Sequence, residues 1–140
     1  MAPVTEDQQT FISQTMPLAE LLGVRAVTVE ATEVVLALDW RPELCTAGGA
    51  LHGGAVMALA DSAGGTCAFL NLPEGATGTS TIESKTNFFA GVRDGTATAT
   101  AHPLHVGRTT IVVETDVFGP DDRRVAKVIQ TQAVLGTRAP

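Results

Sequence analysis

The feature that most constrains the fold is one long helical segment, residues 52–70, followed by four segments rich in Thr, Val and Ile. One stripe of this helix is apolar: Val56, Leu59, Ala60, Ala63, Cys67 and Leu70. Gly64 and Gly65 cost the helix roughly 1 kcal/mol each, which indicates that another group packs closely there. The β-rich segments span 77–89, 95–105, 108–118 and 124–135. Short turn signals separate them, so consecutive segments should pair as antiparallel neighbours.

The residues before this helix predict one shorter helix and two strands. Apolar residues at helical spacing predict a helix over 11–22, which ends at Gly23. Alternating β-branched residues predict strands over 24–29 and 33–40. We expect a flexible arm over residues 1–10 and a single domain over residues 11–140. The order of elements predicts an α+β fold in which a strongly curved antiparallel sheet wraps around one long helix.

Charge and hydropathy exclude several classes of protein. The formal net charge is -6, so no basic field attracts a phosphate backbone and we expect no nucleic-acid partner. Asp61 and two glycines interrupt the longest apolar stretch, so we expect no membrane span. The two cysteines form no CxxC motif and the start of the chain is polar and acidic, which favours a cytoplasmic location. Residues 85–140 hold seven of the nine basic residues, which fits either ordinary surface or attraction for a small anionic ligand.

The start of the long helix and Asp61 are the candidate site. The first N–H groups of a helix lack internal partners and lie at its positive end, so they can stabilise an oxyanion. Gly53 and Gly54 let a ligand approach this backbone closely, and His52 precedes them. Asp61 has no charged residue three or four positions away, and its apolar helix should desolvate the carboxylate and raise its pKa. Taken alone, Asp61 is better explained as an ordinary polar residue on a helix edge, or as one paired with a distant Arg.

The spacing of Gly53 and Asp61 makes a prediction about assembly. They are eight residues apart, which is about 12 Å along a helix. An oxyanion donor and a nucleophile or base must both lie about 3 Å from the reacting carbonyl. One straight helix cannot place both there, whereas two antiparallel copies related by a two-fold axis can. If both residues act on one carbonyl, we expect a homodimer with shared active sites; a dimer of dimers stays open.

The segment Leu51-His-Gly-Gly54, followed by Ala-Leu-Ala-Asp61, resembles the helix signature of the hotdog-fold acyl-CoA thioesterases. The similar groups include the phenylacetate-pathway, 4-hydroxybenzoyl-CoA and 1,4-dihydroxy-2-naphthoyl-CoA thioesterases, and the likeness extends over residues 15–136. It implies hydrolysis of an acyl-CoA thioester with an aromatic, short or medium-chain acyl group. It further implies that the Gly53 N–H binds the thioester oxygen, that His52 orients the thioester, and that Asp61 acts as nucleophile or as general base.

The resemblance also implies roles for residues outside the helix. Ser80 matches a polar position that assists the water or the carboxylate, although an ordinary strand serine explains it equally well. His105, Gly107 and Arg108 lie in a segment similar to one near the bound CoA, and Gly54 belongs to the same substrate-binding set. Many relatives have Asn or Gln six residues before the motif His. Here that residue is Thr46, whose hydroxyl could take over the polar role.

Two other functions fit the same fold. A hotdog hydratase or dehydratase would pair its carboxylate with a His placed otherwise, and a non-catalytic acyl-CoA-binding protein would bind without turnover. The thioesterase interpretation needs no cofactor, because CoA is part of the substrate. No residue pattern indicates a metal site.

Overall fold

The computed structural model describes residues 3–136. Its elements follow the chain in this order: α1 Glu6–Thr15, α2 Pro17–Leu22, β1 Arg25–Glu30, β2 Glu33–Asp39, the short 3-10 helix η1 Pro42–Leu44, α3 Gly53–Leu70, β3 Gly78–Phe88, β4 Thr96–Val106, β5 Thr110–Phe118 and β6 Arg124–Leu135. The presence of both helices and an antiparallel set of strands confirms the predicted α+β class.

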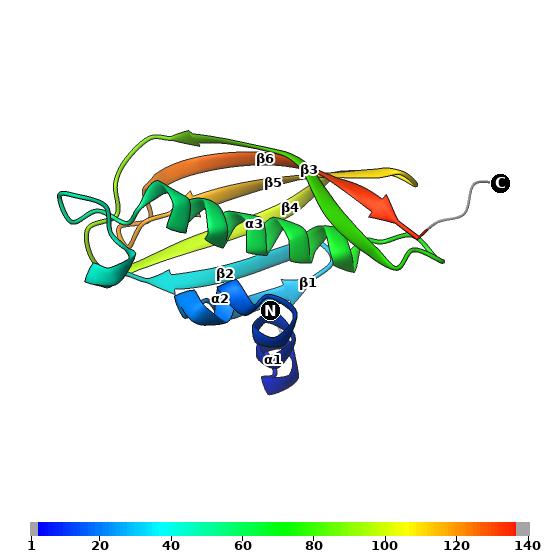
Figure 1. Ribbon diagram of the computed structural model, residues 1–140, viewed down its shortest axis with the longest axis horizontal. Coiled ribbons are helices and arrows are strands. Elements are labelled where there is room, and N and C mark those ends of the chain that lie inside the picture. The colour runs from blue at the N-terminus through cyan, green and yellow to red at the C-terminus, as the bar shows by residue number, and fades with distance from the viewer. Residues whose placement is uncertain (1–2, 137–140) are drawn as a thin grey trace.

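The strands form one antiparallel sheet in the order β1-β2-β4-β5-β6-β3. Helix α3 runs along one face of this curved sheet, while α1 and α2 lie beside β1 and β2 (Figure 1). The expected arrangement, a curved antiparallel sheet around one long helix, is confirmed and is the hotdog fold. Within residues 3–136, none of the helices has the length and apolarity that a membrane crossing requires.

The core lies between α3 and the sheet. The predicted stripe of α3 is buried from Val56 to Cys67, and only Leu70 at the end of the helix is exposed. The facing positions of β4 are small: Ala97, Ala99 and Ala101 are fully buried. Alanines at alternate positions face the helix because side chains of a strand alternate between the two faces of the sheet. Small residues on the sheet and on the helix allow a close approach, which explains the alanine-rich composition of both.

The path from β3 to β4 differs from the expectation that consecutive strands pair. β3 pairs with β6 at one edge of the sheet, and β4 lies between β2 and β5. The connection over residues 89–95 is held at the start of α3, because the N–H of Leu51 donates to the carbonyl of the buried Val92. The chain therefore crosses the end of the helix instead of turning back on β3. Of the four strands after α3, only β4, β5 and β6 pair with their neighbours along the chain as predicted.

The N-terminal region also differs from the prediction of a flexible arm followed by one helix. Helix α1 begins at Glu6, within the expected arm, because Thr5 and Gln8 form a capping box. The side chain of Gln9 accepts from the N–H of Ala26 on β1 at 2.7 Å, which ties α1 to the sheet. The expected helix over 11–22 is broken at Met16, because Pro17 disfavours helical backbone in the residue before it. Residues 1–2 and 137–140 lie outside the described part of the chain.

Candidate active site

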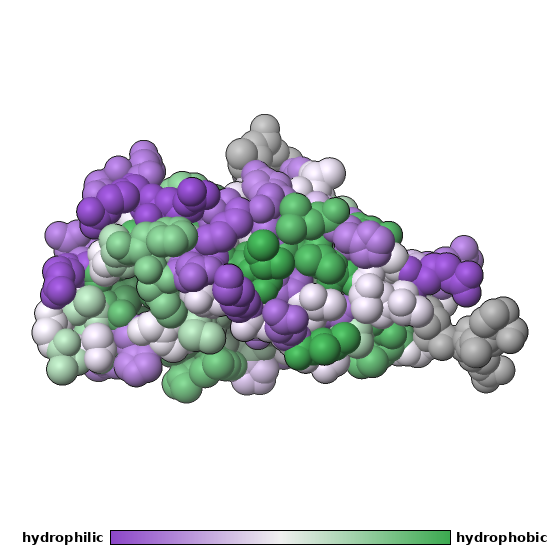
Figure 2. All heavy atoms as spheres, turned by 90° about the horizontal axis from the view of Figure 1, so that it is seen from above, coloured by the Kyte–Doolittle hydropathy of each residue, from purple (hydrophilic) through white to green (hydrophobic). Residues whose placement is uncertain are grey.

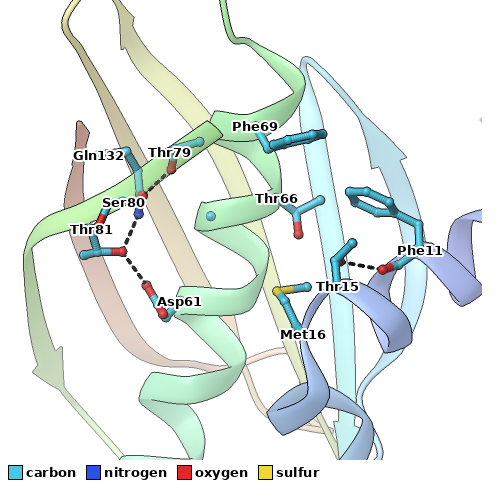
Figure 3. A pocket seen from close by; sticks show the side chains of 11 residues that line it. Phe11, Thr15, Met16, Asp61, Thr66, Phe69, Thr79, Ser80, Thr81 and Gln132 are labelled. Atoms are coloured by element: carbon cyan, nitrogen blue, oxygen red, sulfur yellow. Dashed lines mark hydrogen bonds between the residues drawn. The ribbon is translucent and has the colours of Figure 1, made fainter. Parts of the chain in front are cut away.

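Asp61 lies on the side of α3 that faces strand β3 and lines an open pocket of about 310 Å³ (Figure 3). The pocket is bounded by α1, the residue after it, α3, β3 and β6: its lining residues are Phe11, Thr15, Met16, Asp61, Gly65, Thr66, Phe69, Thr79, Ser80, Thr81 and Gln132. The Asp61 side chain is exposed in the single chain. The expected desolvation by an apolar helix is therefore not provided by one chain, because Asp61 lies beside the buried stripe and not on it.

Two donors converge on one oxygen of the Asp61 carboxylate. The amide of Gln130 on β6 donates to Oδ1 at 3.0 Å, and the hydroxyl of Thr81 on β3 donates to the same atom at 3.3 Å. Within residues 3–136, Oδ2 accepts no hydrogen bond and the carboxylate has no ion pair. An ionised carboxylate only accepts hydrogen bonds, so these donors match its charged form.

A chain of hydrogen bonds continues away from Asp61. Thr79 donates to the Oε1 atom of Gln132, and the Gln132 amide donates to the Thr81 hydroxyl at 2.7 Å (Figure 3). A hydroxyl has a single proton, so accepting from Gln132 leaves Thr81 free to point its O–H at Asp61. The network fixes the direction of every donor from Thr79 to the carboxylate.

The start of α3 provides a free backbone donor. His52 is the N-cap, and its Nδ1 accepts from the N–H of Gly54 at 2.8 Å. The N–H of Gly53 donates to no acceptor within residues 3–136. It lies at the positive end of an 18-residue helix, where an anionic oxygen is stabilised. Of the two glycine donors singled out from the sequence, Gly53 thus has no acceptor within residues 3–136, whereas Gly54 donates to His52.

A single chain does not bring Gly53 and Asp61 together. His52 and Gly54 line a second hollow of about 300 Å³ between α2 and α3, whereas Asp61 lines the pocket against β3. Helix α3 is continuous from Gly53 to Leu70, so the estimate of about 12 Å along its axis applies.

Neither Thr46 nor Ser80 donates a hydrogen bond to the Asp61 carboxylate. Thr46 is exposed in the loop before α3, where its N–H donates to the carbonyl of Ala50. Ser80 lines the pocket but is opposite Ala133 in the sheet register, so its side chain and that of Thr81 lie on opposite faces. The neighbouring Thr81 makes the contact that a hydroxyl on this strand was expected to make.

The segment with His105, Gly107 and Arg108 ends β4 and forms the turn into β5. Gly107 closes this turn through its N–H, which donates to the carbonyl of Thr110 at 2.9 Å. Arg108 is exposed and forms no ion pair with any residue in 3–136. Figure 1 shows this hairpin at the end of the sheet opposite the loop that leads into α3.

Sequence reasoning missed Gln130, Gln132 and Thr81. One signal was available: Gln130 and Gln132 stand at alternate positions of a predicted strand whose other residues on that face, such as Val128 and Val134, are apolar. Two amides on an inward face need partners there.

A thiol nucleophile is not an alternative at Cys67, because burial raises its pKa to about 11 and keeps it protonated. Residues 3–136 contain no group of three or more His, Cys, Asp or Glu side chains placed to hold a metal ion.

Fold and site together define a hotdog protein. Its long helix α3 carries a carboxylate, Asp61, that forms no ion pair within residues 3–136, and the backbone N–H of Gly53 at the start of α3 has no acceptor there. The sequence model of the thioesterase superfamily matches residues 48–126, more than half of the chain. The chain belongs to the thioesterase superfamily, a class of thioester hydrolases.

Known proteins similar to the chain come from several organisms. ComA2 of Bacillus subtilis, which carries a provisional esterase name, is 33% identical over 84% of this chain and 94% of that protein. The 1,4-dihydroxy-2-naphthoyl-CoA hydrolase of Listeria monocytogenes is 33% identical over 71% of this chain and 80% of that protein. A crystal structure of a variant of thioesterase PA1618 from Pseudomonas aeruginosa has a TM-score of 0.86 at 27% identity and covers 97% of both chains.

Proposed function

We propose that the protein hydrolyses acyl-CoA thioesters to a free acid and CoA, with Asp61 as the catalytic carboxylate and the Gly53 N–H as oxyanion donor. The observation that carries this proposal is the Asp61 carboxylate itself. It stands on the wall of a pocket, held through Oδ1 by two neutral donors, with Oδ2 open and without a counter-charge. What distinguishes this carboxylate from an ordinary surface acid is that donors from two strands, β3 and β6, hold one of its oxygens at the wall of a pocket.

Two mechanisms use this carboxylate. As a nucleophile, Oδ2 adds to the thioester carbon, the C–S bond breaks, and water then hydrolyses the resulting anhydride. As a general base, Oδ2 takes a proton from water while the water oxygen adds to the carbon, and the tetrahedral intermediate expels the thiolate, which receives the proton. In both cases negative charge develops on the carbonyl oxygen, which the Gly53 N–H binds.

The active site is shared between two chains in this proposal. Gly53 and Asp61 of one chain are too far apart for one carbonyl, as argued above. Strand β3 supplies a surface for a second copy, because it pairs with β6 alone among the described strands and leaves an eleven-residue edge open. Ile82, Phe88 and Phe89, on and just after this strand, are exposed. From above, the side along which β3 runs in Figure 1, hydrophobic side chains gather between hydrophilic ones (Figure 2).

The pocket beside Asp61 suits an uncharged acyl group. Asp61 is the one charged residue that residues 3–136 contribute to its lining, so these residues supply no cation to bind a second carboxylate on the acyl chain. The far wall is apolar: Phe11 of α1 and Phe69 of α3 contact each other, with their ring centroids 5.6 Å apart, and Met16 lines the same pocket. These walls favour an aromatic, short or medium-chain acyl group over a dicarboxylic one.

Replacing Phe11 tests the acyl pocket. We expect Phe11→Ala to lower kcat/KM for phenylacetyl-CoA about five- to tenfold, because an aromatic wall contact is lost. Activity on acetyl-CoA should stay within about twofold, because a two-carbon group need not reach that wall. Leu21→Ala is the matched control, since Leu21 on α2 is exposed and does not line the pocket. Equal losses on both substrates would contradict the assignment of this wall to the acyl group.

Arg108 provides a free cation for the CoA phosphates. We expect Arg108→Ala to raise KM for an acyl-CoA about tenfold with kcat unchanged, because one charge-assisted contact to phosphate is lost. Hydrolysis of the matching acyl-pantetheine, which lacks the nucleotide, should not change. Arg123→Ala is the control, because Arg123 lies in the β5–β6 turn at the other end of the sheet. An unchanged KM for the acyl-CoA would remove Arg108 from the site.

A thiol-release assay on aromatic and straight-chain acyl-CoAs tests the proposed function directly. Release of free CoA is the expected result. Binding of acyl-CoA without thiol release by the wild type would instead identify a non-catalytic binding protein. Hydration of crotonyl-CoA without thiol release would identify a hydratase.

A further inference from the structure

We propose that Gln130 is a positioning residue for Asp61: its amide holds Oδ1 so that Oδ2 is the oxygen that reacts. This inference rests on the proposed catalytic role of Asp61. The Gln130 Nε2 atom lies 3.0 Å from Oδ1, and the link joins the middle of β6 to the middle of α3. It brings together residues 69 positions apart in the chain.

The burial of Gln130 is costly and has no structural benefit of its own. Its side chain is 1% exposed, on the inward face of β6 next to the apolar Val128. The Oε1 atom is buried and has no hydrogen-bond partner in residues 3–136. An amide oxygen buried without a partner destabilises a fold, and an apolar side chain of similar size would fill the same space without that cost.

Gly64 leaves room for the same Gln130 side chain, at a cost in the stability of α3. A Cβ atom at this position of α3 would clash with Gln130 Oε1. Glycine inside a helix lowers helix stability, so the close packing expected at the Gly64-Gly65 pair is explained at Gly64 by the Gln130 amide. Gly65 has open space beside it and lines the Asp61 pocket. Both costs, in strand and in helix, serve one contact: the Gln130 hydrogen bond to Asp61.

This hydrogen bond gives the two carboxylate oxygens different roles: Oδ1 is held by Gln130, and Oδ2 faces the substrate. An exposed Asp on a helix samples several rotamers, and only one of them can present an oxygen to a carbonyl held by another element. Gln130 is fixed by the sheet on both sides, because β6 pairs with β5 and β3. Thr81, on the edge strand, donates to the same Oδ1 at the longer distance of 3.3 Å. Gln130 is therefore the more rigid of the two supports.

The test compares turnover with stability in Gln130→Met, which keeps the volume and removes the donor. We expect kcat to fall about 10- to 100-fold, KM to change less than about twofold, and Tm to stay equal or rise. Thr115→Val is the matched control: Thr115 is also buried on the inward face of the sheet and its hydroxyl has no hydrogen-bond partner within residues 3–136, but it makes no hydrogen bond to Asp61. Thr115→Val should have the same Tm and the same kcat as the wild type.

Turnover of Gln130→Met within about threefold of the wild type would overturn the proposal, as would an equal loss of kcat in Thr115→Val. If Gln130→Met does not fold, Gln130→Leu provides the same comparison, and failure of both to fold would assign Gln130 a structural role instead. The two proposals fail differently. A wild type without thiol release overturns the proposed function and this inference with it, whereas an active wild type with an equally active Gln130→Met overturns this inference alone.

Discussion

Replacing Asp61 by Asn is expected to lower turnover by at least about two orders of magnitude, the usual scale for loss of a general base or nucleophile. The fold should be retained, because the carbonyl oxygen of Asn can still accept the hydrogen bonds from Gln130 and Thr81. Asp61→Ala should show a similar loss. The measurement is thiol release under saturating acyl-CoA, together with Tm for each variant.

A second acidic residue provides the control for Asp61. Glu74, in the loop after α3, is exposed and has no hydrogen bond or ion pair within residues 3–136, so Glu74→Gln changes the net charge by the same amount. It should retain wild-type turnover. Wild-type-like activity of both Asp61 variants would falsify the catalytic assignment, because neither Asn nor Ala can act as a base or as a carboxylate nucleophile.

The elements that the sequence predicted well are those whose local pattern agrees with their tertiary environment. The apolar stripe of α3 faces the sheet, and the β-rich segments all form strands. The start of α1 was missed because its first turns are polar and are held by capping and by Gln9, not by an apolar face. The position of β3 was missed because strand order depends on the path of the 89–95 connection, which lies beside the start of α3, where the Leu51 N–H donates to the Val92 carbonyl.

The candidate site was predictable only as far as it lies on one element. His52, Gly53 and Asp61 are all placed by the register of α3. The contacts of Asp61 depend on which residues of β3 and β6 point at the helix, and neighbouring residues of a strand point to opposite faces. Ser80 was therefore singled out where Thr81 makes the contact, and Gln130 was not considered at all. A pattern within one strand cannot reveal its phase relative to a helix 69 residues away.

Removing the Gly53 N–H is the second change with a large expected effect. Gly53 is the first residue of α3, where proline is tolerated because this N–H has no partner within the helix. The preceding His52 has φ -57 and ψ 134, the extended backbone that a residue before proline prefers. Gly53→Pro thus removes the donor and keeps the helix. We expect kcat to fall about 100- to 1000-fold, the scale for loss of one oxyanion donor.

Gly53→Ala separates the donor from the added volume. A Cβ atom at residue 53 would lie 3.2 Å from the ring of Phe88, a tight contact that alanine and proline share. Phe88 is half-exposed and its ring can shift. Alanine keeps the N–H, so Gly53→Ala should lose less than about tenfold in kcat if the donor is what matters. Equal losses in both variants would attribute the effect to crowding by Phe88 and remove Gly53 from the oxyanion site.

The two inactive variants together test whether the site is shared. If each carbonyl is bound by Gly53 of one chain and attacked at Asp61 of the other, a mixed dimer of Gly53→Pro and Asp61→Asn chains has one site with both defects and one intact site. Random pairing of equal amounts makes half of the dimers mixed, so co-refolded chains should recover about a quarter of wild-type activity. Sites contained within single chains would recover none, since every chain then carries a defect. Recovery can arise only if Gly53 of one chain and Asp61 of another act on the same carbonyl, and two α3 helices running in opposite directions would bring these residues together.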